Sequence, residues 1–176
     1  GMTVDGSGGL LLADSANGRI RRLDPATKTI TTVAGDRGRS AEGDGGVATL
    51  AALNRPHGLA RDSRGNLYIA DWENRRVRRI DAVTGVITTV IADLWVIGIA
   101  VDAADNVYIA DHYGNRIWRF DAADGASRVI AGNGEEGFSG DGGPATAARL
   151  RRPYGIVAGA DGSVIFSEQE NRRIRK

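Results

Sequence analysis

The residues of this sequence that could do chemistry are one glycine-rich stretch and two histidines. Gly132, Gly134 and Gly137, in the stretch "AGNGEEGFSGDGG", have the G-x-G-x-x-G spacing of loops that hold a dinucleotide pyrophosphate. His57 and His112 carry side chains that can bind a metal ion or transfer a proton. Whether either chemistry is available depends on the elements around these residues.

The glycine spacing lacks the element that a dinucleotide-binding loop requires. Such a loop opens a helix within a βαβ unit, so that the pyrophosphate lies at the helix N-terminus. The residues that follow Gly137 read "FSGDGGP", and they cannot start a helix there. We therefore assign these glycines to a long connector, and we expect no nucleotide and no other cofactor.

The sequence also supplies few ligands for a metal ion. A catalytic zinc site takes three protein ligands and a water, and this chain has two histidines and no cysteine. Asp44 and Asp141 recur in a duplicated "GDGG", but the stretch lacks the alternating oxygen ligands of a calcium loop. We expect no metal site, and we assign both aspartates to capping a short helical turn.

The charge balance bears on the class of partner. The chain has 23 Lys and Arg residues and 22 Asp and Glu residues, a net charge of +1. A nucleic-acid-binding domain usually has a marked basic excess, so a nucleic-acid partner is not favoured. The longest apolar run, residues 94–101, is far shorter than the roughly 20 residues that cross a bilayer. We therefore expect no membrane partner.

An internal repeat organises the chain. Four similar segments each carry a carboxylate at the same place, with spacings of 57, 40 and 57 residues. From Gly43 to Gly58, 11 of 16 residues are identical to those 97 positions later. The chain is therefore a duplicated unit of 97 residues, each with two repeats. The four anchor carboxylates are Asp14, Asp71, Asp111 and Glu168.

Each repeat reads as short strands separated by turns. In the second repeat the expected strands are residues 58–62, 66–71, 76–80 and 86–91, rich in β-branched residues and bounded by turn residues. Groups of four such strands at a period near 40 residues are typical of β-propeller blades. We predict an all-β propeller of about four four-stranded blades per chain, the last blade incomplete. The blades are expected at about 2–35, 57–92, 97–132 and 154–176, joined by long connectors at 36–56 and 133–153, in a single propeller domain or propeller fragment.

The motif "RPHGLARDSRGNLYIADWENRRVRRID" resembles the NHL repeat, with its Pro-x-Gly start, its Gly-Asn-Leu-Tyr-Ile-Ala-Asp strand and its Asn-Arg strand. The stretch "IAGNGEEGFSGDGGPATAARLRRPYGI" is similar to the glycine-rich connectors of bacterial NHL proteins. The resemblance covers nearly the whole chain. It implies a propeller that serves as a binding platform, and it does not by itself imply a reaction.

An enzyme is the alternative interpretation. "RPHGLARD" resembles the segment that supplies a zinc histidine in peptidyl-amidating lyases, which are related propellers. That zinc site needs histidines at the equivalent positions of other blades, where this chain has Ile97 and Tyr154. A propeller-type lyase or hydrolase with a metal near His57 is therefore the alternative, and a non-catalytic binding module is favoured.

Arginines recur in every repeat. Each anchor carboxylate is followed five residues later by an arginine, and we expect an ion pair that stabilises each blade. Strings such as "RRVRRI" leave an RNA-binding NHL domain as a second alternative, which the near-zero net charge disfavours. The four arginines are Arg19, Arg76, Arg116 and Arg173.

Loops on one face of the blades form the predicted site. In an antiparallel meander, the turn between the second and third strands lies on the same side as the connector to the next blade. Large side chains that turn geometry does not require gather there, and loops on a rigid scaffold commonly carry binding. We predict a protein or peptide ligand bound by His57, Trp72, His112, Tyr113, Phe138 and Tyr154.

Self-association is a further expectation. The last repeat stops after its third strand, so blade faces and a strand edge would be left open. An even number of blades per chain would allow two copies to complete one ring. A homo-oligomer is therefore the expected way to close the propeller.

Overall fold

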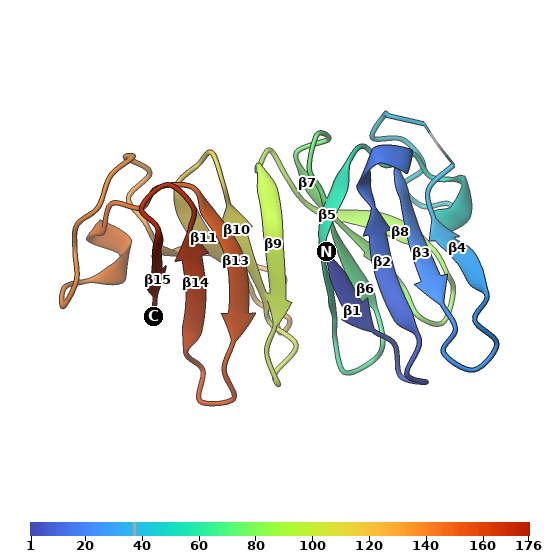
Figure 1. Ribbon diagram of the computed structural model, residues 1–176. Coiled ribbons are helices and arrows are strands. Elements are labelled where there is room, and N and C mark those ends of the chain that lie inside the picture. The colour runs from blue at the N-terminus through green and yellow to red at the C-terminus, as the bar shows by residue number, and fades with distance from the viewer. Residues whose placement is uncertain (37) are drawn as a thin grey trace. The chain divides into compact units, whose positions relative to one another are not determined.

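The computed structural model of the protein describes residues 1–36 and 38–176; Arg37, in the first connector, lies outside the described residues. The chain forms two compact units, Gly1–Leu94 and Trp95–Lys176. Each unit contains two antiparallel sheets whose strands follow one another in sequence order (Figure 1). The predicted all-β class is confirmed, as is the incomplete last blade.

The first unit has two sheets of four strands, in the orders β1-β2-β3-β4 and β5-β6-β7-β8. A long connector joins β4 to β5 and contains the short 3-10 helix η2 (Ala48–Leu50). The strands are β1 (Met2–Val4), β2 (Leu10–Asp14), β3 (Arg19–Leu23), β4 (Ile30–Ala34), β5 (Pro56–Arg61), β6 (Leu67–Asp71), β7 (Arg76–Ile80) and β8 (Ile87–Ala92).

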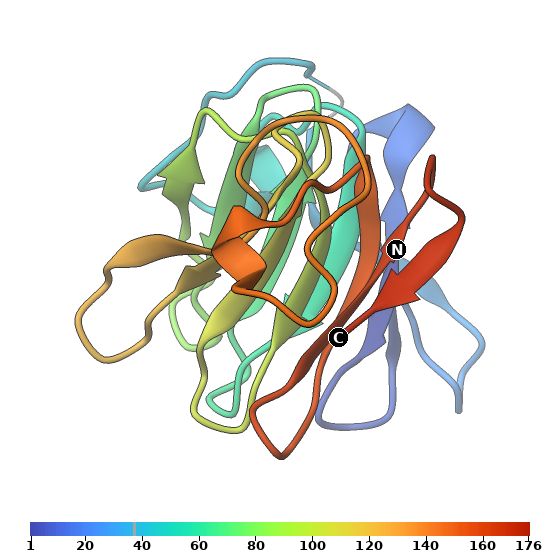
Figure 2. The ribbon, with the colours of Figure 1, turned by 90° about the vertical axis from the view of Figure 1, so that its left-hand side faces the viewer.

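The second unit has one sheet of four strands and one of three, β13-β14-β15, in which β15 is an edge. Its connector carries the 3-10 helix η3 (Ala145–Ala147), drawn in orange in Figure 2. The strands are β9 (Val96–Val101), β10 (Val107–Asp111), β11 (Arg116–Phe120), β12 (Ser127–Ala131), β13 (Pro153–Ala158), β14 (Val164–Glu168) and β15 (Arg173–Arg175).

The turn between the second and third strands has the same backbone in every sheet. One residue of each turn is left-handed: Gly18 has φ of 59°, and its counterparts Arg75, Asn115 and Arg172 have φ between 51° and 55°. Gly18 also lies where a Cβ atom would be 2.6 Å from the Leu53 carbonyl oxygen. Glycine and asparagine tolerate this conformation best, so the turn fixes how the loops leave the sheets.

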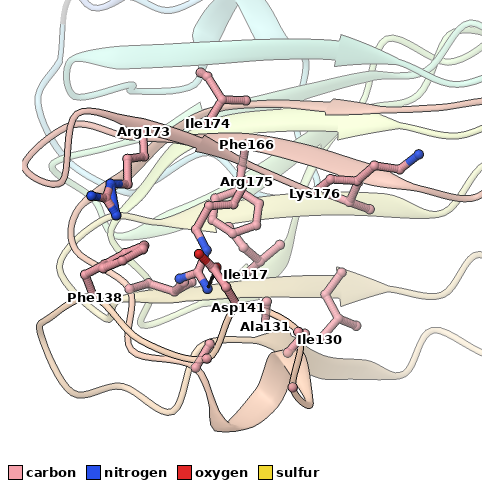
Figure 3. A pocket seen from close by; sticks show the side chains of 17 residues that line it. Ile117, Ile130, Ala131, Phe138, Asp141, Phe166, Arg173, Ile174, Arg175 and Lys176 are labelled. Carbon is pink, nitrogen blue, oxygen red and sulfur yellow. Dashed lines mark hydrogen bonds and ion pairs between the residues drawn. The ribbon is translucent and has the colours of Figure 1, made fainter.

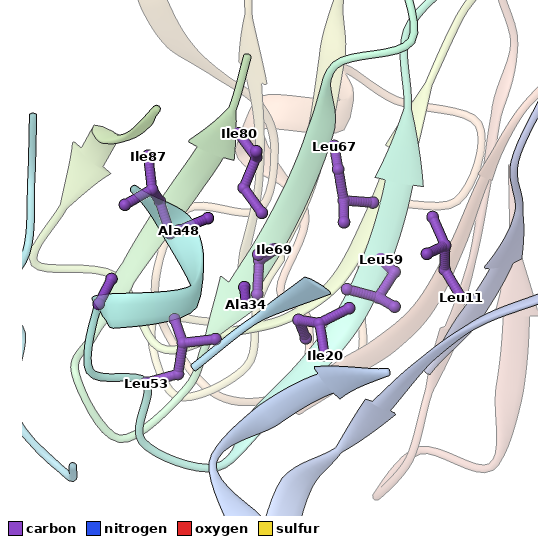
Figure 4. Close-up of a cluster of buried hydrophobic side chains, with 11 residues drawn as sticks. Leu11, Ile20, Ala34, Ala48, Leu53, Leu59, Leu67, Ile69, Ile80 and Ile87 are labelled. Carbon is purple, nitrogen blue, oxygen red and sulfur yellow. The ribbon is translucent and has the colours of Figure 1, made fainter. Parts of the chain in front are cut away.

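The core of the first unit lies between its two sheets and the connector (Figure 4). Ile20, Ile69 and Ile87 are fully buried there, on one face of β3, β6 and β8 respectively. Alternate residues of a strand point to opposite faces, which explains why every second residue of β6 faces this core. The cluster consists of Leu11, Ile20, Ala34, Ala48, Ala51, Leu53, Leu59, Leu67, Ile69, Ile80 and Ile87.

Each connector is bound to the sheet before it in the same way. The Gly35 N–H donates to the Ala48 carbonyl at 3.0 Å in the first unit, and the Gly132 N–H donates to the Ala145 carbonyl at 2.9 Å in the second. Gly132 has φ of 87°, and a Cβ atom there would overlap the Asn115 carbonyl oxygen. The glycine that looked like part of a nucleotide loop is therefore required by the close approach of connector and hairpin.

The anchor carboxylates pair with arginines seven residues later. Asp71 and Arg78 are both fully buried, and an Arg78 guanidinium nitrogen lies 3.6 Å from the carboxylate. The third repeat has Trp118 in place of the arginine, and its Nε1 donates to Asp111 at 3.4 Å. The other two pairs are Arg21 with Asp14 at 3.7 Å and Arg175 with Glu168 at 3.8 Å.

The prediction that the pairs involve arginines five residues after the carboxylates is wrong. Arg76 stands opposite Asp71 in the strand register, but its guanidinium donates to the Asn74 and Ala41 carbonyls at 3.2 and 3.5 Å. The carboxylate is instead reached by the arginine two residues further along the same face, which the connector buries. The residues concerned are Arg19, Arg76, Arg116 and Arg173.

The prediction that Asp44 and Asp141 cap a helical turn is also wrong. Val47 and Pro144 hold the N-cap positions of η2 and η3, without a side-chain hydrogen bond to the turn. Asp44 instead pairs with Arg78 at 2.8 Å. Asp141 pairs with Arg175, the counterpart of Arg78, at 2.6 Å. A buried arginine thus has a carboxylate at both ends of its guanidinium.

Among the described residues, no helix is long and apolar enough to cross a bilayer.

Candidate ligand-binding site

His112 is the buried centre of a cluster of aromatic side chains in the second unit. It follows β10 directly, and its backbone N–H donates to the Trp95 carbonyl at 2.8 Å. Its ring Nδ1 lies 3.1 Å from the Pro153 carbonyl oxygen. A carbonyl only accepts, so Nδ1 carries the proton and the ring is held as the Nδ1–H tautomer. Burial lowers the pKa of His112, which favours the neutral ring.

Two aromatic rings pack edge to face against this histidine, and a third packs against one of them. Tyr113 and Tyr154 lie 4.9 and 6.0 Å from the His112 ring, and Trp95 lies 5.2 Å from Tyr113, measured between ring centroids. The Arg152 guanidinium lies 4.1 Å from the centroid of the Tyr113 ring, a favourable cation–π distance. We call these five residues the aromatic cluster. Tyr113 and Tyr154 are 49% and 42% exposed, so the cluster presents two phenol rings to solvent.

Backbone contacts hold the aromatic cluster in place. The Arg152 N–H donates to the Asn115 side-chain oxygen at 3.0 Å. The Asp111 carboxylate accepts from the Trp95 and Gly114 N–H groups at 3.1 and 3.2 Å. Burial raises the pKa of Asp111, because desolvation disfavours the charged carboxylate. The two hydrogen bonds act in the opposite direction and stabilise the charged form inside the blade. The cluster is a preorganised surface rather than a set of free side chains.

The first unit carries a smaller pair at related positions. His57, the counterpart of Tyr154, packs edge to face against Trp72 with 5.8 Å between ring centroids. Ser15 stands in the place of His112, and its hydroxyl donates to the Pro56 carbonyl at 2.5 Å, 41 residues on, as His112 does to Pro153. A side chain at this position bridges to the start of the next blade in both units. Only the second unit uses a ring for it.

Phe138 lies apart from the aromatic cluster of its own unit. Its ring lies under two guanidinium groups, 3.7 Å from Arg173 and 5.3 Å from Arg175, beside a separate groove of the second unit (Figure 3). The structure therefore brings together His112, Tyr113 and Tyr154. It pairs His57 with Trp72, and it leaves Phe138 elsewhere.

The cluster offers stacking surfaces and hydrogen-bond donors. A cavity of about 190 Å³ beside it is lined by Tyr154, Ser167 and Gln169. In the part of the chain that the structure describes, no group of three or more His, Asp or Glu side chains is placed to hold a metal ion. Rings, a guanidinium and small polar groups suit recognition of a peptide or other organic ligand.

Two family models match this chain. The teneurin NHL domain matches residues 26–98, and the NHL repeat matches residues 95–120. The chain is built from NHL repeats. Its fold is accordingly the NHL-type β-propeller, and each four-stranded sheet is one blade.

Curated relatives of these NHL repeats are much longer proteins. Protein SUPPRESSOR OF QUENCHING 1, chloroplastic, from Arabidopsis thaliana is 40% identical over 85 residues, 48% of this chain and 8% of that protein. NHL repeat-containing protein 2 from Bos taurus is 37% identical over 90 residues, 50% of this chain and 12% of that protein. The NHL repeats thus correspond to a small part of each relative.

Solved structures share the fold of this NHL chain. A protein of unknown function from Bacteroides thetaiotaomicron superimposes with a TM-score of 0.76 at 20% identity, over 98% of this chain and 45% of that one. Virginiamycin B lyase from Staphylococcus aureus gives 0.66 at 17% identity, over 98% and 50%. A putative gluconolactonase gives 0.66 at 16%, over 96% and 56%. At these identities the likeness shows the fold alone.

Sequence reasoning missed two members of the aromatic cluster in this NHL chain. Trp95 stands inside the apolar run of residues 94–101, immediately before β9, and nothing in that run distinguishes it as a surface residue. Arg152 precedes Pro153 and has a left-handed backbone, with φ of 54°. Its counterpart Arg55 has φ of 51°, so the repeated Arg-Pro pair marks a fixed bend. The recurrence of this Arg-Pro pair is the sequence signal that could have identified Arg152 as a site residue.

Proposed function

We propose that this chain is a non-catalytic recognition module that binds a protein or peptide ligand through the aromatic cluster. The observation that carries the proposal is the pair of half-exposed tyrosines held in fixed positions around a buried, hydrogen-bonded histidine. Rigid aromatic rings offer a large contact area at a low cost in conformational entropy. Tyrosine and arginine are also the residues that most often dominate binding energy at protein interfaces.

The chemistry of the cluster favours a peptide with an aromatic or carboxylate group. The Tyr113 and Tyr154 rings can stack with an apolar or aromatic side chain of a ligand. Arg152, stacked on Tyr113, keeps its planar guanidinium in a set orientation and can bind a carboxylate. In the first unit, the His57–Trp72 pair offers an aromatic contact of the same kind on its own.

The test is selection of ligands from a displayed random peptide library. Peptides enriched on the wild-type chain are titrated by calorimetry against Tyr113→Ala. We expect this substitution to weaken binding about 30-fold, equivalent to about 2 kcal/mol, because it removes a central aromatic contact. Phe138→Ala is the matched control, an equally exposed ring outside the cluster, and should leave affinity within about twofold.

Two results would overturn the proposal. One is that the selected peptides bind Tyr113→Ala as tightly as the wild type. The other is that Phe138→Ala weakens binding as much as Tyr113→Ala does, because the aromatic cluster would then have no special role.

A metal-dependent lyase or hydrolase is the competing function. It predicts a metal ion near His57, and the described residues offer no cluster of three ligands there. Elemental analysis of the purified protein separates the two. The recognition module is expected to bind far less than one divalent ion per chain. A stoichiometric ion would instead support catalysis, because catalytic zinc is held by three protein ligands.

A further inference from the structure

A small cavity in the first unit lies between the turn that follows β2 and the end of the first connector. Its volume is about 200 Å³. It is lined by residues 15–18, which include the 3-10 helix η1 (Ser15–Asn17), by Arg39 and by residues 53–55. A cavity of about 150 Å³ is enough to hold a benzene ring. This cavity therefore has room for a ligand with a single ring.

The second unit has an aromatic ring of its own at the equivalent place. Tyr113 stands 97 positions after Ala16, and its ring lies 4.1 Å from the Arg152 guanidinium. Arg55 is the counterpart of Arg152, and the two backbones match, with φ of 51° and 54°. Ala16 offers only a methyl group, and the Arg55 side chain is 64% exposed. The first unit therefore holds the guanidinium in place without the ring that covers it in the second.

A second difference leaves a backbone donor at the cavity. The Arg152 N–H donates to the Asn115 side-chain oxygen at 3.0 Å. Gly18 stands in the place of Asn115 and has no side chain. Among the described residues, the Arg55 N–H has no acceptor. A ligand oxygen could accept from this N–H group as the Asn115 oxygen does in the second unit.

The charge of the cavity differs from that of its counterpart. Arg39 and Arg55 are the charged residues that line it. Arg39 stands in the place of Glu136, which pairs with Arg151 at 2.6 Å in the second unit. Within residues 1–36 and 38–176, Arg39 has no ion pair. Arg55 uses one guanidinium nitrogen to bind Glu73 at 3.3 Å. Two cations at one cavity favour an anionic ligand.

We propose that this cavity binds an aromatic carboxylate. The ring of the ligand stacks on the Arg55 guanidinium in the place that Tyr113 takes in the second unit, because a planar guanidinium stacks on aromatic faces. Its carboxylate accepts hydrogen bonds from Arg39 and from the Arg55 N–H. Two sources share this chemistry: a free aromatic acid, and the C-terminal aromatic residue of a polypeptide.

The first probe is 4-fluorobenzoate, titrated against the 176-residue chain and followed by ¹⁹F NMR. Saturable binding with a dissociation constant of about 1 mM is expected, because a single ring makes few contacts. The neutral 4-fluorobenzamide has nearly the same shape and should bind at least fivefold more weakly, because it gives the two arginines no anionic partner.

The second probe is acetyl-glycyl-4-fluorophenylalanine with a free carboxyl group, which represents the end of a polypeptide. Tighter binding of this probe than of 4-fluorobenzoate would assign the cavity to a polypeptide terminus. Tighter or equal binding of 4-fluorobenzoate would assign it to a free acid. Either result supports a site for an aromatic carboxylate.

Three variants of the chain show where the probe binds. Ala16→Tyr supplies the ring that the second unit has, so it should fill the cavity and weaken binding at least tenfold. Ala16 is exposed, so the chain should tolerate the change. Ala26→Tyr is the matched control, the same substitution at an exposed position in the turn between β3 and β4, and it should leave binding within twofold. Arg55→Ala removes the stacking partner and should weaken binding at least fivefold.

Four results would overturn the proposal. The first is that neither fluorinated acid binds saturably. The second is that 4-fluorobenzamide binds as tightly as 4-fluorobenzoate, because the carboxylate would then have no role. The third is that Ala26→Tyr weakens binding as much as Ala16→Tyr does. The fourth is that Arg55→Ala binds the probe as tightly as the wild type, because the ring would then lie somewhere else.

Discussion

At the scale of single residues, burial gives the repeated anchor carboxylates a structural role. Asp71 is buried with Arg78, and burial raises its pKa although it accepts hydrogen bonds from the Asn54 N–H and the Asn74 amide at 2.8 Å. The desolvation penalty on the charged carboxylate therefore exceeds the stabilisation that these hydrogen bonds provide. The carboxylate is a structural group that fixes the turn, the connector and the arginine together.

Replacement of Asp71 by asparagine tests this structural role. Asp71→Asn leaves the buried Arg78 with one nearby carboxylate, Asp44, and should lower the free energy of unfolding by about 3 kcal/mol. Asp14→Asn is the matched control, because the Asp14–Arg21 pair is partly exposed. It should cost less than about 1 kcal/mol. Urea unfolding measures both, and equal losses would contradict the account.

The buried ring of His112 predicts a pH dependence. Burial lowers its pKa in the folded chain, whereas the unfolded chain titrates near the ordinary value of about 6.5. As pH falls through about 6.5, the unfolded state takes up a proton that the folded state does not. Stability must therefore decrease on acidification. The negative charges of Asp111 and Glu170 raise the pKa of His112, and the positive charge of Arg152 lowers it further. All three groups therefore contribute to the pH dependence of stability.

The measurement is the free energy of unfolding at several pH values between about 7.5 and about 5.5, the range around the histidine pKa. His112→Asn is the reference, because an asparagine amide can still donate to the Pro153 carbonyl and does not titrate. The wild type should lose stability with acid more steeply than this variant. Parallel pH profiles would show that His112 is not held neutral.

At the scale of elements, strand positions followed from sequence and connector paths did not. Runs rich in β-branched and aromatic residues, bounded by turn residues, marked β6 and β7 to within a residue, because both signals are local properties of the sequence. Phe138 was assigned to the binding face because its connector leads toward the next blade. The structure places it beside Arg173 and the groove instead. The path of a long glycine-rich connector depends on contacts with distant carbonyls, which local patterns do not encode.

Equivalent positions of the outer strands β4 and β8 differ strongly in burial. Ile87 in β8 is 0% exposed, whereas Ile30, at the same position of β4, is 51% exposed. Ile87→Ala should lower the free energy of unfolding by about 3 kcal/mol through lost burial and the cavity left behind. Ile30→Ala should cost less than about 1 kcal/mol. Thermal or urea unfolding compares them, and similar losses would show that β8 does not close the core.

At the scale of the whole molecule, the duplication explains both what could be predicted and what could not. Short strands recurring at a period near 40 residues predicted the all-β class, and alignment of the repeats predicted the shortened last sheet, because each repeat must build the same sheet. The proposed ligand-binding chemistry lies where the copies differ. Ser15 and His112 make the same bridge to the next blade, but only the histidine gathers Tyr113 and Tyr154 around it. A single difference of this kind between two copies of a repeat has no periodicity or motif by which it could be recognised in the sequence.

The three tryptophans allow the most direct test of ligand recognition by the aromatic cluster. Their indole N–H signals can be followed by NMR in a ¹⁵N-labelled chain while a library-selected peptide is added, with Trp→Phe variants for assignment. Trp95 lies against Tyr113 in the cluster, whereas the Trp118 indole is bonded to Asp111 within its blade. We predict that the Trp95 signal shifts saturably and that of Trp118 does not. Movement of the Trp118 signal with an unchanged Trp95 signal would contradict the account.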